Sequence, residues 1–185
     1  MSEVIVNASP LIFLGNAGRL ELLRPLGQKV LVPLAVHREV TTSLHSDRAA
    51  TAVLDATWLV PIAVDTIPQA VAAWDLGPGE SEVIALGLRH PNARLIVDDL
   101  AGRRCATALG LQVTGTLGVV IAAYRRGEIE DPSAVLAELR DAGMWLSDGV
   151  IAGALRLAGW TSPTAASLVG SPSVSGSRQA SDEAE

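Results

Sequence analysis

Short apolar runs alternate with amphipathic stretches along most of this 185-residue chain. Five runs rich in β-branched or aliphatic residues have the length and composition of strands, and they cover residues 3–7, 28–32, 58–64, 93–97 and 111–113. Apolar residues recur at helical spacing between and after them, which predicts helices from Pro10, from Pro33, and over 46–56, 80–88, 100–109, 116–126, 133–144 and 147–158. Strands that alternate with helices predict an α/β fold, a mostly parallel sheet with helices on both faces.

Two local signals refine this pattern. Ser9 precedes Pro10, so the first helix is expected to begin with Ser9 as its N-cap and Pro10 at its first helical position. Pro61 lies inside the third strand, and because proline cannot donate to a sheet ladder, that strand is predicted at an edge.

The composition of the chain changes near Thr161. From there Ser, Ala, Gly and Pro dominate up to the acidic end at Glu185, with few large apolar residues to pack. We therefore expect one domain over residues 1–160 and a disordered tail over 161–185. A hydrophobic content of 49% in 185 residues is enough for one core.

Composition also limits the classes of function. No apolar stretch is long enough to cross a membrane, and the first residues lack a basic segment followed by an apolar run, so we expect a soluble, unexported protein. Cys105 is the only cysteine, which excludes a disulfide framework within the chain and fits the cytoplasm. The net charge of −6 argues against nucleic-acid binding by bulk attraction, so a polyanion would need a local basic patch or a metal.

Acidic and amide side chains gather where strands and helices meet. In open α/β sheets, ligands bind beyond the carboxyl ends of the strands, and Asn7 and Asp98 follow two separate strands. Glu39 lies near the end of the helix after the second strand, while Glu80 and Glu82 begin a later helix. If these side chains meet, their mutual repulsion needs a cation, and their oxygen atoms suit one or two Mg²⁺ or Mn²⁺ ions.

Each of these residues also has an ordinary structural interpretation. Asn7 can cap the turn after its strand, and Glu39 can be a solvated charge near a helix end. The remaining acids can be helix N-terminal acids or N-caps.

Several segments, in this order along the chain, resemble PIN-domain proteins, in particular the branch of small prokaryotic proteins related to VapC-type toxins. The segments are Ile5-Val-Asn-Ala-Ser-Pro-Leu-Ile12, Val32-Pro-Leu-Ala-Val-His-Arg-Glu-Val40, Leu76-Gly-Pro-Gly-Glu-Ser-Glu-Val-Ile-Ala-Leu86, Leu95-Ile-Val-Asp-Asp99 and Leu111-Gln-Val-Thr-Gly-Thr-Leu-Gly118. The resemblance runs from about residue 3 to 159 and leaves the tail outside.

The resemblance implies a three-layer α/β/α sandwich and a ribonuclease that uses Mg²⁺ or Mn²⁺ to activate water against an RNA phosphodiester. By this similarity Asn7 falls at the first acid of the family and Glu39 at the second. The third is Glu80 or Glu82, and the fourth is Asp98, with Asp99 as its alternative. All six would be metal ligands, and Glu39, Glu82 and Asp98 would be the catalytic residues.

One departure from the family pattern concerns charge. Asn7 stands where PIN domains commonly place an Asp, and a neutral amide oxygen can coordinate a metal or orient water but cannot help to neutralise the ion. The substitution lowers the charge of the site by one, so metal affinity should fall with it. A PIN-like binding module that has lost efficient hydrolysis is therefore the alternative function.

Other residues are expected to support the site. The hydroxyls of Ser9 and Thr116 lie beside the metal pocket by the resemblance, with helix capping as the alternative. Arg103, Arg104 and Arg89 are the candidates for a phosphate-binding rim.

Four tryptophans are scattered along the chain and are expected to be core or interface anchors, and they are Trp58, Trp74, Trp145 and Trp160. The resemblance further implies three partners: an RNA substrate, a cognate antitoxin laid across the acidic pocket, and a second copy in a homodimer.

Overall fold

The computed structural model describes residues 3–42 and 47–161 of the chain. Its centre is a five-stranded sheet in the order β3-β2-β1-β4-β5, with every pair of neighbours parallel. The strands are β1 (Glu3–Val6), β2 (Lys29–Pro33), β3 (Leu59–Ile62), β4 (Arg94–Ile96) and β5 (Gln112–Thr114). The predicted parallel α/β sheet is confirmed, and β3, which contains Pro61, is at an edge.

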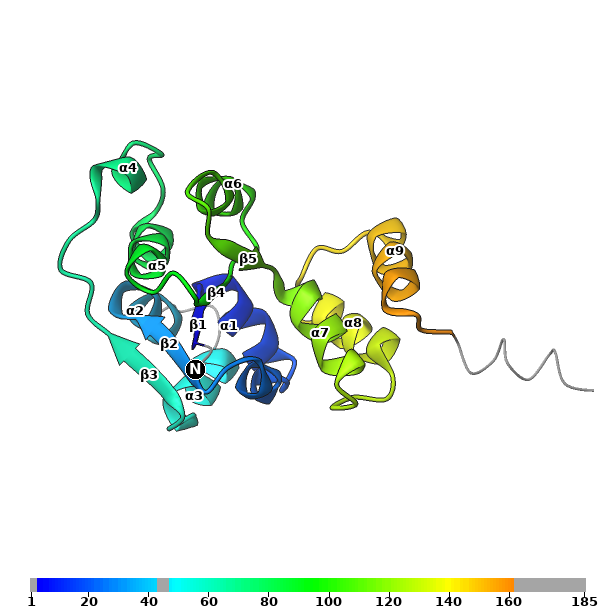
Figure 1. Cartoon of the computed structure of the whole chain (residues 1–185). Coiled ribbons are helices and arrows are strands. Elements are labelled where there is room, and N and C mark those ends of the chain that lie inside the picture. The colour runs from blue at the N-terminus through cyan, green and yellow to red at the C-terminus, as the bar shows by residue number, and fades with distance from the viewer. Residues whose placement is uncertain (1–2, 43–46, 162–185) are drawn as a thin grey trace, which may run out of the picture.

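Helices connect the strands and cover the sheet (Figure 1). They are α1 (Ala8–Asn16), the 3₁₀ helix η1 (Leu20–Leu26), α2 (Leu34–Thr42), α3 (Asp47–Asp55), α4 (Gln69–Ala72), α5 (Pro78–Arg89), α6 (Leu100–Ala108), α7 (Thr116–Arg125), α8 (Pro132–Asp141) and α9 (Asp148–Ala158). The short helix α4 is absent from the sequence prediction. Among the described residues, no helix is long and apolar enough to cross a membrane.

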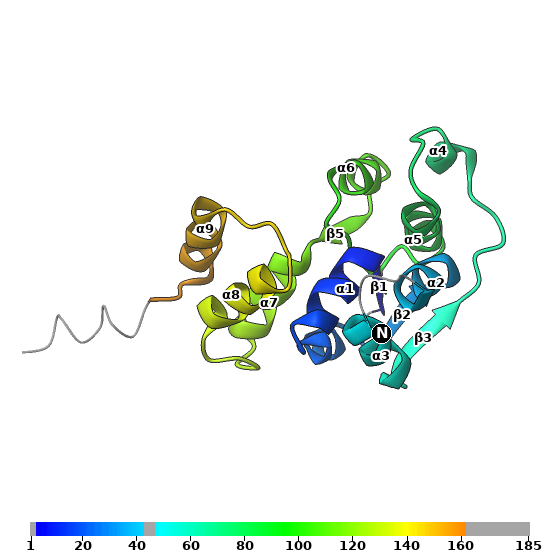
Figure 2. The same cartoon turned by 180° about the vertical axis from the view of Figure 1, so that it is seen from behind.

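The helices form two layers around the sheet (Figure 2). Helices α1, η1, α3 and α7 pack together as one layer, while α5 packs against α4 and α6 as the other, and α2 contacts helices of both. This is the expected α/β/α sandwich. The core runs through the sheet, where the side chains of Ile5, Leu95 and Ile96 are fully buried.

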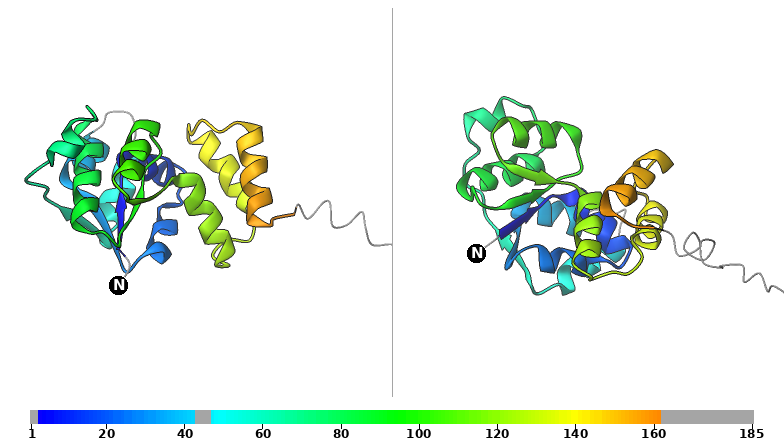
Figure 3. Two further views of the ribbon diagram at one scale, coloured as in Figure 1. Left: turned by 45° about the horizontal axis from the view of Figure 1, so that its top comes forward. Right: turned by 45° about the vertical axis from the view of Figure 1, so that its right-hand side comes forward.

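The last three helices extend from the β5 edge of the sheet (Figure 3). Helix α7 packs against α8 and α9, and α7 also contacts η1 and α1. Helix α9 contributes only Leu155 to the buried residues, so most of its apolar surface is exposed or partly exposed. The predicted tail over 161–185 lies, from residue 162 onward, outside the described residues.

The predicted start of the first helix is wrong by two residues. Helix α1 begins at Ala8, so Asn7 occupies the N-cap position and Ser9 lies inside the first turn. Pro10 is therefore the third helical residue, where its missing N–H still leaves no helical hydrogen bond unmade.

Candidate active site

Asn7 follows β1 and Asp98 comes shortly after β4, so both residues lie at the carboxyl end of the parallel sheet. The two strands are neighbours with Val6 opposite Ile96, and the ladder continues as the Asn7 N–H donates to the Ile96 carbonyl at 3.0 Å. Helices α2 and α5 pack against each other, and they carry Glu39 and Glu80. The topology therefore brings oxygen-bearing side chains from two strand ends and two helices to the carboxyl end of the sheet.

Asn7 is the least ordinary residue of this region. Its side chain is 4% exposed, it makes no capping hydrogen bond although it occupies the N-cap of α1, and its Oδ1 has no hydrogen-bond partner among the described residues. A buried polar atom without a partner costs about 1–3 kcal/mol. Turn capping thus does not explain Asn7.

The Asn7 oxygen borders the same space as Glu39. A methyl group on Gly79 would lie 3.6 Å from Asn7 Oδ1 and 3.0 Å from Glu39 Oε2, so the glycine leaves room between the two oxygens. Glu39 is itself exposed, so its carboxylate also contacts solvent. These residues, with Ser9 and Glu80, line a cavity of about 360 Å³, which we call the acidic pocket.

Glu80 is electrostatically coupled to two other acids. Burial is the largest cause that raises the pKa of Glu80 above its ordinary value, the charges of Asp99 and Glu39 raise it further, and the Gly77 N–H, which donates to Glu80 Oε2 at 3.3 Å, partly opposes them. A methyl group on Gly102 would lie 3.8 Å from both Glu80 Oε1 and Asp99 Oδ2. Negative charge is therefore concentrated around Glu80.

Asp98 is held by Thr116 at the start of α7. The Thr116 N–H donates to Asp98 Oδ1 at 2.7 Å and the Thr116 hydroxyl donates to Asp98 Oδ2 at 2.6 Å. Thr116 is fully buried, so the carboxylate has a fixed orientation. Asp99 does what an N-cap does, because its Oδ2 accepts from the Gly102 N–H of α6 at 2.9 Å.

Glu82 does not line the acidic pocket. Its Oε2 accepts a hydrogen bond of 2.9 Å from the Ala35 N–H in the first turn of α2, where a negative charge also suits the helix dipole. Only two positions separate Glu80 from Glu82, yet at 3.6 residues per turn they point to different sides of α5. Glu80 is the acid of this helix that reaches the pocket.

A second, larger cavity adjoins the first. It has a volume of about 990 Å³ and runs between α1, β5, α6, α7 and α9, and we call it the groove. Ser9 lines both cavities, while Asp98 and Asp99 line the groove. The predicted cluster is therefore spread over two cavities that share Ser9 as a lining residue.

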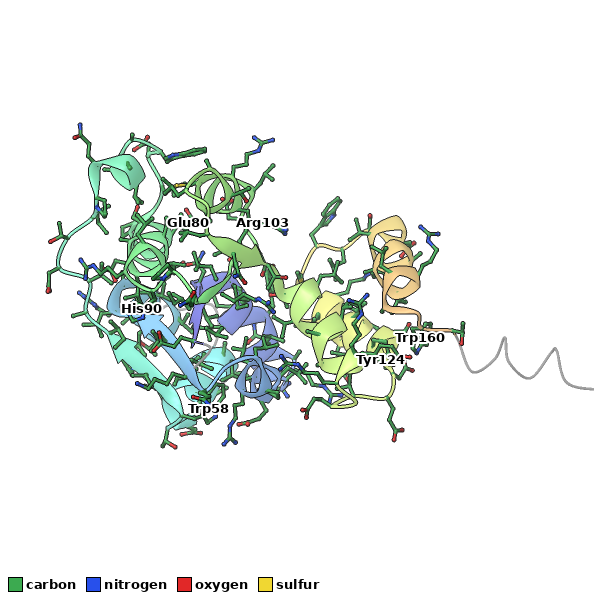
Figure 4. The ribbon with its side chains drawn as sticks, in the orientation of Figure 1. Trp58, Glu80, His90, Arg103, Tyr124 and Trp160 are labelled. Atoms are coloured by element: carbon green, nitrogen blue, oxygen red, sulfur yellow. The ribbon has the colours of Figure 1, made fainter. Side chains whose placement is uncertain are left out.

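The three predicted rim arginines lie in different places. Arg103 lines both the groove and a separate depression along α6, whereas Arg104 lines only that depression. Arg89 lies at the far end of α5, where it donates to the Thr66 carbonyl at 3.1 Å and lines neither cavity. Figure 4 labels Glu80 and Arg103 at one end of the sheet, and His90, which follows Arg89, away from them.

Sequence reasoning missed two glycines. Gly79 clears the space between Asn7 and Glu39, and a methyl group on Gly115 would lie only 2.7 Å from Asp98 Oδ1. Both follow short turn segments at the start of a helix, which is the signal that could have drawn attention to them.

The comparison with protein families agrees with this geometry. The model of the family DUF3368, a PIN domain, matches residues 3–160. The chain belongs to the PIN-domain family. PIN domains are typically nucleases and generally use divalent metal ions. A comparison with curated proteins gave no match.

The residues of this PIN domain fit a hard divalent cation by donor chemistry. Within residues 3–42 and 47–161, no three His, Cys, Asp or Glu side chains are close enough together to hold a metal ion. A metal would instead combine the unpartnered amide oxygen of Asn7 with fewer carboxylates and complete its shell with water and phosphate oxygens, as Mg²⁺ does.

Proposed function

We propose that this PIN domain is a metal-dependent endoribonuclease, the toxin of a type II toxin–antitoxin pair related to the VapC type. The observation that carries the proposal is the buried Asn7 oxygen, which has no hydrogen-bond partner in the described part of the chain and lies beside carboxylates that repel each other. Both features are unfavourable in isolation, and one bound cation would relieve both. Family membership adds the nuclease fold.

In the proposed mechanism, Asn7, Glu39 and Glu80 would hold Mg²⁺ or Mn²⁺ in the acidic pocket. The ion would supply a water of lowered pKa and stabilise charge on the phosphate. Asp98, whose orientation Thr116 fixes, accepts a proton from the attacking water or orients that water toward the phosphorus. Arg103 lies beside Asp98 along the groove and neutralises a phosphate oxygen of the bound strand.

The test is cleavage of a labelled structured RNA pool by the purified protein with Mn²⁺ or Mg²⁺, beside an EDTA control. Glu80→Gln should abolish cutting, and Glu82→Gln is the matched control, because it changes an acid of the same helix that lies outside the pocket. Cutting that survives EDTA, or that Glu80→Gln leaves unchanged, would refute the nuclease proposal.

The toxin proposal also names partners. A cognate antitoxin would lay a helix or extended segment across the acidic pocket, the PIN domain would form a homodimer, and the protein would act in the cytoplasm. Co-purification with the product of a neighbouring gene, followed by loss of RNA cleavage in the complex, tests the antitoxin. Light scattering of the purified protein tests the dimer.

A second function is supported by the neutral charge of Asn7. A binding module that keeps the PIN scaffold but hydrolyses poorly needs no full set of carboxylates. In that case binding to RNA or a protein would survive both EDTA and Glu80→Gln, and no condition would give metal-dependent cutting.

A further inference from the structure

Trp145 is a large apolar side chain left almost wholly in solvent. It lies between α8 and α9 and is 87% exposed, so of the two roles expected for the tryptophans it does not fill that of a core anchor. Leu157 of α9 is 78% exposed on the same cavity. The wall of the groove that α9 forms is therefore apolar and uncovered, with an aromatic ring at its rim.

The groove leads directly to the candidate active site. Its lining includes Ser9, Asp98 and Asp99 of the candidate site as well as Trp145 and Leu157. Its volume of about 990 Å³ is at the upper end of the range for small-molecule pockets, so it has room for more than one phosphodiester group. An occupant of the groove would lie beside Asp98.

Positive charge faces the groove although the whole chain is acidic. Arg103 has no ion pair within the described part of the chain, and a methyl group on Gly115 would lie 3.3 Å from its guanidinium and 2.7 Å from Asp98 Oδ1. Arg125 and Arg126 also line the groove. Arg125 donates to the Leu157 carbonyl and Arg126 to the Pro25 carbonyl. Because a backbone carbonyl is neutral, neither hydrogen bond cancels the positive charge of the arginine.

We propose that the groove binds single-stranded RNA, with an unpaired base stacked on Trp145 and a phosphate held by Arg103, so that the backbone passes Asp98. This inference rests on the proposed nuclease function. A ring and an apolar wall gain contact area from an unpaired base, whereas a duplex keeps its bases stacked inside and presents phosphates and sugars. A second protein could cover the apolar wall, but it would give the three arginines no polyanion to neutralise.

The experiment measures binding apart from cleavage. Fluorescence anisotropy follows a labelled, unstructured RNA of about twelve nucleotides in EDTA, where metal-dependent cutting cannot occur, with the hairpin duplex of the same composition as a competitor. Trp145→Ala should weaken binding about tenfold or more, and Trp145→Phe should restore part of it. Trp74→Ala is the matched control, because Trp74 is 39% exposed and lines neither cavity.

Two arginines on α6 test the phosphate contact. Arg103→Gln should lower affinity and flatten the dependence of log Kd on log salt by about 0.7. Arg104→Gln should change both less, because Arg104 is exposed but does not line the groove. Thermal unfolding confirms that each variant is folded.

Several results would overturn this proposal. One is equal affinity of wild type and Trp145→Ala for the RNA, and another is a preference for the duplex. A third is self-association through Trp145 without RNA binding, which would identify the groove as a protein interface. Failure of the nuclease proposal is separable. A chain that binds the strand through Trp145 and Arg103 but never cuts it with Mn²⁺ keeps the groove proposal and refutes the catalytic one.

Discussion

Gly79→Ala is a small perturbation aimed at the space between Asn7 and Glu39. The added methyl group would lie 3.0 Å from Glu39 Oε2, 3.2 Å from Val36 Cγ2 and 3.6 Å from Asn7 Oδ1. It would therefore occupy the position from which both oxygens could reach a shared ligand. The substitution adds no charge and removes no donor.

Two opposing effects set the expected change in the free energy of unfolding of Gly79→Ala. Replacing Gly by Ala in a helix stabilises by about 0.4–1 kcal/mol, while crowding a packed site costs about 1–3 kcal/mol. Because the carboxylate of Glu39 is exposed and can move, we expect a cost near the lower limit of about 1 kcal/mol, so that the net loss after the gain is at most about 0.6 kcal/mol. Catalysis is more sensitive, since a displacement of about 1 Å in a site can reduce the rate about a hundredfold.

The assay pairs thermal unfolding with Mn²⁺-dependent RNA cleavage. Gly149→Ala is the matched control, because Gly149 is also the second residue of its helix and a methyl group there would meet nothing within 4 Å. The control should gain about 0.4–1 kcal/mol and keep full activity. The reasoning is refuted if Gly79→Ala cleaves as fast as the control, since the pocket would then not be where the ligand binds.

Three further substitutions test individual contacts. Thr116→Val removes the hydroxyl that donates to Asp98 and should lower the free energy of unfolding in urea by about 1.5–3 kcal/mol. Thr107→Val removes an exposed hydroxyl that donates to the Arg103 carbonyl on α6, and it should leave the free energy of unfolding near that of wild type. In EDTA, Glu80→Gln should raise Tm at neutral pH. The pKa of Glu80 is higher in the folded than in the unfolded protein, so ionisation of Glu80 lowers the stability of wild type as pH rises, and Gln avoids this loss. The gain should vanish below about pH 4.3, where Glu80 is protonated in both states. Glu82→Ala should cost about 1 kcal/mol by removing a helix N-terminal acceptor. Glu82→Gln keeps an acceptor oxygen, so it should lose only the charge–dipole contribution of about 0.3–1 kcal/mol and leave cleavage unchanged.

Much of the fold could be predicted from the sequence because strands and helices carry different apolar periods. The five predicted strands all form, and Pro61 placed its strand at an edge. Two local details could not be predicted. Helix α4 has only four residues, too few to show a period. The apolar pattern from Pro10 predicted a single helix and did not show that this stretch divides into α1 and the 3₁₀ helix η1, which contains Pro25.

The site was predictable as far as topology dictates it. Asn7 and Asp98 follow neighbouring parallel strands, so their position at the carboxyl end of the sheet follows from the strand order. The orientation of side chains around α5 depends on how α5 packs on α2, which no local pattern encodes, so Glu80 and Glu82 were indistinguishable. The exposure of Trp145 depends likewise on where α9 packs, and only the structure reveals the groove.

The most direct test of the metal site is Mn²⁺ binding by titration calorimetry to wild type, Asn7→Asp and Asn7→Ala. The account predicts that wild type binds, that Asn7→Asp binds more tightly because it adds a carboxylate, and that Asn7→Ala binds more weakly because it removes the buried oxygen. Equal affinity in all three proteins, or no binding to any of them, would contradict a cation site built on Asn7.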